Sequence, residues 1–397
     1  MQIHNNLGGS RTIVSVHNNV RVVNVGHGGY VQHPYFNRGG HAYYSRTYYQ
    51  GGAYRTAVYR GYYYHGFQYY GYHPGFWFHP GFYGWGLRPW GFGVSWGIGF
   101  GGWGWGGAPW YGYYGGYFAP YPVYPSPAFW LTDYLISENL QAAYAARAEA
   151  NAEANAAAND AAAAAASNPG ADSSGAAANA GPVALTPEVK EAIAEEVKAE
   201  LAAQQQQAAA EAANPQVAAP AVSASGDPSA QAPAAAQNEV PPALDPAQRT
   251  FVVDNDITVV SDGQECQLTG GDVITRLTDT PDADNKVTAS VSASKKSECA
   301  AGKSVLVSVE DLQEMHNHFE EQLDNGMKAL AEKQGTGDMP KAPDTGVTES
   351  DIPAPKPDTS AAKDLSDQAA AADQTEAQVK QETAATPAPA QGQDSKQ

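Results

Sequence analysis

The stretch that decides the fold of this chain is Ser308-Val-Glu-Asp-Leu-Gln-Glu-Met-His-Asn-His-Phe-Glu-Glu-Gln-Leu-Asp-Asn-Gly-Met-Lys-Ala-Leu330. Serine favours the helix N-cap, and Asp311 follows Ser308 by three positions, as in a capping box. Apolar side chains then recur every three or four residues, at Leu312, Met315, Phe319, Leu323, Met327 and Leu330. This spacing places them in one stripe, so the sequence predicts an amphipathic helix that packs on a core.

The segment before this helix reads as a series of short β-strands. Runs rich in β-branched residues are separated by turns that contain Gly, Asp and Asn. The predicted strands are Thr250–Asp254, Ile257–Val260, Val273–Leu277, Val287–Val291 and Val305–Ser308. We therefore predict that residues 249–334 form one globular domain, a small SH3-like β-barrel closed by its C-terminal helix.

Most of the remaining sequence has a biased composition. Residues 26–125 form a Gly/Tyr/Trp/His-rich region that reads as low complexity, and the segments after Tyr144 are rich in Ala, Pro, Gln, Ser and Asp. The latter composition buries too little apolar surface to offset the entropy lost on ordering. The predicted fold class is therefore mostly low-complexity or disordered, with the small barrel, its helix and two isolated helices.

Two further helices are predicted from local pattern. Ser126-Pro127 offers an N-cap and an N1 proline for a helix that runs into an Ala-rich spacer, over residues 126–166. Thr186-Pro187 begins an amphipathic helix over residues 185–213. Its exposed faces are expected to carry Glu191, Glu195, Glu196 and Lys198.

The other boundaries follow from composition. Residues 1–25 hold short β-branched runs on either side of Asn18-Asn19, a turn dipeptide that favours a short hairpin. Residues 167–184 and 214–248 are predicted linkers, and residues 335–397 are predicted to be a disordered acidic Pro/Ala tail.

Charge divides the chain into two unlike parts. Residues 1–132 carry seven arginines and no lysine or carboxylate, while the rest of the chain carries a formal charge of −26. Arginine beside glycine and tyrosine resembles sequences that bind RNA, which gives a cytoplasmic RNA-associating or condensate-forming protein as the alternative function. The arginines are sparse and the acidic part repels phosphates, so nucleic-acid binding is not favoured.

A strict alternation of bulky residues and glycine or serine marks residues 90–101. At period two it predicts one apolar strand face and one bare face, and such a surface favours self-association. The candidate residues for self-association are Trp90, Phe92, Trp96 and Phe100. Residues 89–132 carry no charge, but their glycines and prolines disfavour a membrane-spanning helix.

The two cysteines, Cys266 and Cys299, lie within the predicted domain and are the candidate disulfide. They could equally be inert buried thiols in a reducing compartment. No motif indicates an enzyme, and no cofactor is predicted. His316 and His318 point about 200° apart on a helix, so one helix cannot chelate a metal with both, and His316 with Glu320 reads as an ordinary surface pair.

Three parts of the chain resemble segments of uncharacterised bacterial envelope proteins. These parts are Tyr124–Leu140, Leu185–Lys198 and residues 249–334. The resemblance implies a Gly/Tyr/Trp-rich N-terminal region, an Ala/Gln-rich spacer and an SH3-like C-terminal domain, and it implies no known activity.

The function expected from these observations is that of a non-enzymatic, envelope-associated structural or interaction protein. The aromatic–glycine region would self-associate or adhere to surfaces, with an envelope surface or another protein as further partners. Met1 does not begin a secretory signal, so a periplasmic or surface location would need a signal upstream, and the chain would otherwise be cytoplasmic.

Overall fold

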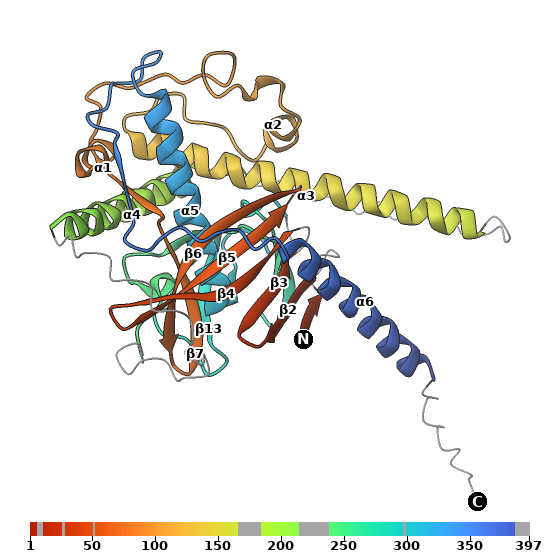
Figure 1. The fold of residues 1–397 in the computed structure, drawn as a ribbon. Helices are drawn as coiled ribbons and strands as arrows, with labels where there is room; N and C mark the ends of the chain where they lie inside the picture. Colours follow the sequence, from red (N-terminus) through yellow and green to blue (C-terminus); the bar gives the residue numbers. More distant parts are fainter. Residues whose placement is uncertain are drawn as a thin grey trace, which may run out of the picture.

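The computed structural model describes residues 1–5, 11–25, 28–50, 52–165, 184–213, 238–296 and 299–385 (Figure 1). Nearly all of the predicted linker over 167–184 and most of the one over 214–248 lie outside the described residues. The last twelve residues of the chain, 386–397, also lie outside them.

The N-terminal part forms a seven-stranded antiparallel sheet that curls into a half-barrel. Its strands follow one another in sequence order. Asn18 and Asn19 adopt left-handed backbone conformations, with φ of 49° and 64°, and they form the turn between the second and third strands. The strands are β1 Gln2–Asn5, β2 Arg11–His17, β3 Val20–Val25, β4 Gly28–Arg38, β5 His41–Gln50, β6 Ala53–Tyr64 and β7 Phe67–His73.

Tyrosine rings stabilise this sheet through contacts across neighbouring strands. The ring centroids of Tyr30 and Tyr48 lie 5.4 Å apart, and those of Tyr59 and Tyr72 lie 6.0 Å apart. Aromatic pairs at these distances add to the free energy of burial. A composition that reads as low complexity therefore builds a regular sheet.

The C-terminal part forms a second antiparallel sheet with strand order β11-β10-β14-β13-β12-β9. It contains the five predicted strands and one more, β11, which carries Cys266 and pairs with β10 along its whole length. Asp262 and Gly263 form the tight turn between these two strands, with φ of 51° and 77°. The bounds are β9 Thr250–Val252, β10 Ile257–Ser261, β11 Gln264–Leu268, β12 Val273–Arg276, β13 Lys286–Ala293 and β14 Ser304–Ser308.

Helix α5, Val309–Lys333, is the predicted amphipathic helix and lies at the centre of the molecule (Figure 1). The hydroxyl of Ser308 caps it by accepting the backbone N–H of Asp311 at 3.0 Å. The apolar stripe of α5 packs into two separate hydrophobic cores. Leu312 and Met315 join the core of the C-terminal sheet. The later residues of the stripe, Phe319, Leu323, Met327 and Leu330, join a second core rich in aromatic residues.

The aromatic core is formed by the region between the two sheets in sequence. Trp90, Trp96, Trp105 and Trp130 are among its buried residues. The elements around it are β8 Phe76–Phe78, α1 Pro80–Leu87, the 3-10 helix Trp105–Gly107, α2 Pro109–Tyr114, α3 Pro127–Ala165 and α4 Pro187–Ala213. Beyond this core, α3 extends away from the body of the molecule (Figure 1).

The segment after α5 packs back onto the N-terminal part. Strand β15, Val347–Glu349, pairs with β8, and Met339 and Ile352 are buried. Helix α6, Ala361–Ala385, lies against the N-terminal sheet, where Ala361 and Leu365 contact Val31. The prediction of a disordered tail over 335–397 is therefore wrong for the described residues 335–385.

The predicted fold class is wrong as well, because most of the chain is folded. The Tyr- and Trp-rich region supplies the rest of the chain with apolar surface, which the composition of the later segments alone does not show. Within the described part of the chain, every helix is too short or too polar to cross a bilayer.

Candidate functional site

Arg46, on β5, is the most enclosed charge of the N-terminal sheet and connects it to α5. Its two terminal nitrogens donate to the carboxylate of Glu314 at 2.7 and 2.8 Å, and its Nε donates to Gln32 at 2.6 Å. The guanidinium carbon lies 4.2 Å and 3.8 Å from the ring centroids of Tyr30 and Tyr59. Hydrogen bonds and aromatic faces thus replace the water lost from this buried cation.

The same pair sets the charge of the Glu314 carboxyl. Burial raises the pKa of this group, but the charge of Arg46 and its hydrogen bonds lower it more, so the pKa lies below its ordinary value. Glu314 is therefore a carboxylate at neutral pH, and the contact is a full ion pair.

Five more arginines of the cationic N-terminal part form ion pairs with carboxylates from the acidic part. These pairs are Arg11–Asp373, Arg21–Glu310, Arg38–Asp351, Arg55–Glu321 and Arg60–Glu239. The opposite charges that divide the sequence are thus brought together by the fold. Exposed pairs of this kind each contribute little stability, whereas the fully buried Arg46 cation needs the half-buried Glu314 carboxylate as its partner.

The four predicted self-association residues do not share one face. Trp90 and Trp96 are buried, with 9% and 7% of their surface exposed, while Phe92 is 61% exposed and Phe100 is fully exposed. The strand predicted from their alternation is wrong. The segment is an irregular loop in which Val94 forms a single bridge with Tyr124.

Glycines shape this loop. Gly91 and Gly101 have φ of 78° and 94°, which other residues rarely adopt. A Cβ on Gly102 would lie 1.8 Å from the carbonyl oxygen of Gly97, so these two backbones approach as closely as only glycine allows. Gly91 and Gly101 therefore provide sharp backbone turns in a loop that presents two of the four aromatic rings to solvent.

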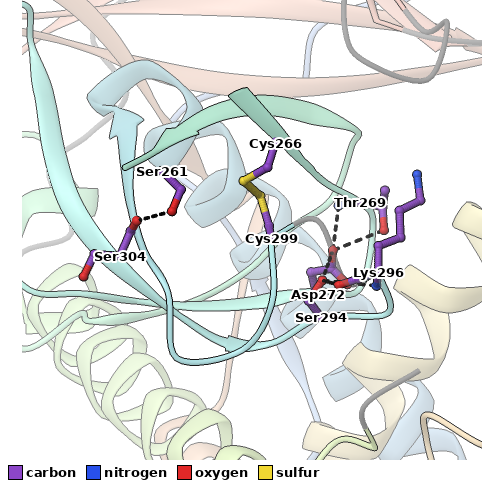
Figure 2. Close-up of a disulfide and its surroundings, with 8 residues drawn as sticks. All are labelled: Ser261, Cys266, Thr269, Asp272, Ser294, Lys296, Cys299 and Ser304. Carbon is purple, nitrogen blue, oxygen red and sulfur yellow. Dashed lines mark hydrogen bonds between the residues drawn. A yellow bond between two sulfur atoms is a disulfide. The ribbon is translucent and has the colours of Figure 1, made fainter. Parts of the chain in front are cut away.

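The sulfur atoms of Cys266 and Cys299 form a disulfide (Figure 2). It connects β11 to the segment that precedes β14, and both cysteines are buried. Near it, the carboxylate of Asp272 accepts hydrogen bonds from the backbone N–H of Thr269 at 2.8 Å and of Lys295 at 2.9 Å. This arrangement closes one end of the C-terminal sheet.

A third cluster lies where side chains of α4 and α5 meet. Glu200 of α4 and His316 of α5 are buried, and Glu320 lies one turn after His316. One ligand-type atom from each of the three lies within 4.8 Å of the others. The Nε2 atom of His316 is 3.5 Å from the Oε2 atom of Glu320. The prediction that His316 and Glu320 form a surface pair is wrong, because both side chains are largely buried.

Burial perturbs the titration of these groups. It lowers the pKa of His316, so the imidazole is neutral at pH 7. It also raises the pKa of Glu320 well above its ordinary value, and the neighbouring charge of Glu200 adds to the effect. Two carboxyl groups in contact in a dry site resist carrying two negative charges without a cation.

His318 lies outside the cluster. Its Nε2 atom faces Gln322 at 2.7 Å, and burial lowers its pKa to about 4. The two histidines therefore point apart, as their spacing on a helix predicts.

The buried glutamates of α4 were not predicted from the sequence. Glu196 was expected to be exposed but is buried, and its Oε2 accepts the backbone N–H groups of Arg249 and Thr250 at 3.2 Å. One pattern in the sequence could have indicated these buried groups. Polar residues recur every four positions on α4, at Glu196, Glu200 and Gln204, and again on α5, at His316, Glu320 and Asp324. A sequence does not show that two such stripes face each other.

Comparisons with protein families, with curated proteins and with solved structures returned no match for this chain.

Proposed function

We propose that this chain is a non-enzymatic, envelope-associated interaction protein that self-associates through the loop carrying Phe92 and Phe100. The observation that carries this proposal is the exposure of both phenyl rings on a loop whose two neighbouring indoles, Trp90 and Trp96, are buried. The buried indoles hold the loop in place, so little conformational entropy is lost when the exposed rings bind.

The binding partner that we propose for this loop is the same loop on a second copy of the chain. Residues 89–132 carry no charge, while the whole chain carries a formal net charge of −19. Two copies repel each other over most of their surfaces, and an uncharged aromatic loop is where they can approach with least repulsion. Aromatic pairs between copies then supply contact area at low entropic cost.

The disulfide supports the proposed compartment. Buried structural disulfides such as Cys266–Cys299 persist in oxidising compartments and are rare in the cytosol. An exported location at the cell envelope agrees with this chemistry. The curled C-terminal sheet is compatible with the SH3-like assignment, and we keep that assignment as part of the proposal.

The alternative function, RNA association, finds less support. Six of the seven arginines in residues 1–132 form ion pairs with carboxylates of the same chain. A phosphate backbone would have to compete with these carboxylates for the arginines.

The test is light scattering of the full chain against concentration, with a double variant, Phe92→Ser/Phe100→Ser. Phe67→Ser is the matched control, because Phe67 is 47% exposed on a different element, β7. We expect assembly of the native chain and the control, unaffected by nuclease and unweakened at 1 M salt, and no assembly of the double variant. Assembly that survives both phenylalanine substitutions, or that nuclease disperses, would contradict the proposal.

A further inference from the structure

We propose that Glu200, His316 and Glu320 bind a divalent transition-metal ion, with Zn²⁺ as the best fit. The three side chains come from two helices far apart in sequence, and their donor atoms lie within 4.8 Å of one another. This site is separate from the aromatic loop and does not depend on its role in self-association.

The donor set matches this class of ion. One imidazole nitrogen with two carboxylate oxygens suits zinc and its neighbours, whereas magnesium and calcium prefer oxygen ligands alone. Two atoms bound to one tetrahedral zinc ion at about 2.1 Å lie about 3.4 Å apart, so donors that are up to 4.8 Å apart need to close in by up to about 1.4 Å. Rotation of the glutamate side chains supplies that movement.

A buried acceptor atom gives an independent indication of a ligand. The Oε2 atom of Glu320 is inaccessible to solvent and accepts no hydrogen bond from any described residue. It faces the Nε2 atom of His316 at 3.5 Å. A buried carboxylate oxygen without a donor is costly, and a cation between it and the imidazole removes that cost.

Neighbouring side chains hold the cluster in position. The side-chain amide of Gln248 donates to the Oε2 atom of Glu200 at 2.7 Å. Asp324, one turn after Glu320, is held by the Tyr72 hydroxyl at 2.9 Å and the Gln204 amide at 3.3 Å. Asp324 therefore belongs to the surroundings of the site, which leaves three protein ligands for the ion.

The experiment is a titration of the chelator-treated full chain with CoCl₂, followed by displacement with ZnCl₂. Cobalt in a site of nitrogen and oxygen ligands gives a visible absorption band that zinc removes. We expect one equivalent to bind. Glu200→Gln, Glu320→Gln and His316→Gln each remove a ligand and should weaken binding more than the loss of an outer partner does, by more than about 100-fold. Gln248→Leu, which removes only the orienting amide, should weaken it by about 10- to 100-fold.

The matched control is His318→Gln, two residues from His316 on the same helix and outside the cluster. It should bind cobalt like the native chain. The glutamine variants keep the size of the glutamates and remove a buried charge, so they should fold, and circular dichroism verifies this.

Two results would overturn the proposal. One is the absence of a cobalt band in the native chain. The other is equal binding by the native chain and by Glu200→Gln and Glu320→Gln, which would place the ion outside this cluster.

Discussion

The guanidinium group of Arg46 forms two hydrogen bonds, of 2.7 and 2.8 Å, with the carboxylate of Glu314, although 268 residues separate them in the sequence. One partner lies on the cationic N-terminal sheet and the other on the helix that follows the C-terminal sheet. The two compositionally unlike parts of the chain are therefore parts of one structure, and α5 is the element that both of them need.

Arg46→Met should destabilise the chain by about 1–3 kcal/mol, because it leaves the half-buried Glu314 carboxylate without its partner. Adding Glu314→Leu to this variant removes the unpaired charge and should restore part of the loss. Urea unfolding of both variants measures this. A loss below about 1 kcal/mol for Arg46→Met would show that the pair is not a structural connection.

The Cys266–Cys299 disulfide should be present in protein made in an oxidising compartment. Intact mass after alkylation of free thiols tests this, and two alkylated cysteines in oxidised material would contradict it. The bond spans 33 residues, so its removal in Cys266→Ser/Cys299→Ser should cost about 3–4 kcal/mol of stability.

Stability should depend on pH through Glu196. Burial raises the pKa of this carboxyl to about 7, above its ordinary value of 4.5. The stability contributed by the neutral form is complete below about pH 4.5 and is lost as pH rises through 7. Glu196→Gln should match the native chain at pH 4.5 and exceed it at pH 8 by about 3 kcal/mol. Equal stability of the two proteins at pH 8 would contradict this prediction.

The elements that depend on a local sequence pattern, such as a cap or an apolar stripe, could be predicted from the sequence. The cap at Ser308 and the stripe that follows it define α5, and the Thr186 hydroxyl caps α4 by accepting the backbone N–H of Val189. Helix α3 begins at Pro127 as predicted, but the hydroxyl of Ser126 forms no hydrogen bond with the described residues. Five strands of the C-terminal sheet were also predicted. The sixth, β11, was missed because Gln264-Glu-Cys-Gln-Leu268 mixes polar and apolar residues at an edge of the sheet.

The rest depends on partners distant in sequence. The strands of the Tyr-rich region are stable because their rings pack across the sheet and because α5 and α6 cover it. Phe92 and Trp96 share one parity in the sequence, yet the loop exposes Phe92 and buries Trp96. The metal-type cluster forms only when α4 and α5 place Glu200 beside His316, which no single helix pattern reveals.

The measurement that tests the central claim most directly is equilibrium urea unfolding of the full chain with two probes. All eight tryptophans lie between Trp77 and Trp130, so their fluorescence reports on the aromatic core that joins the two sheets. Hydrogen exchange of peptides from β5 reports on the N-terminal sheet, and exchange of peptides from β13 reports on the C-terminal sheet. We predict one cooperative transition with coincident midpoints, since both parts share α5 and the Arg46–Glu314 pair. A C-terminal part that stays protected after the tryptophan transition is complete would contradict the account.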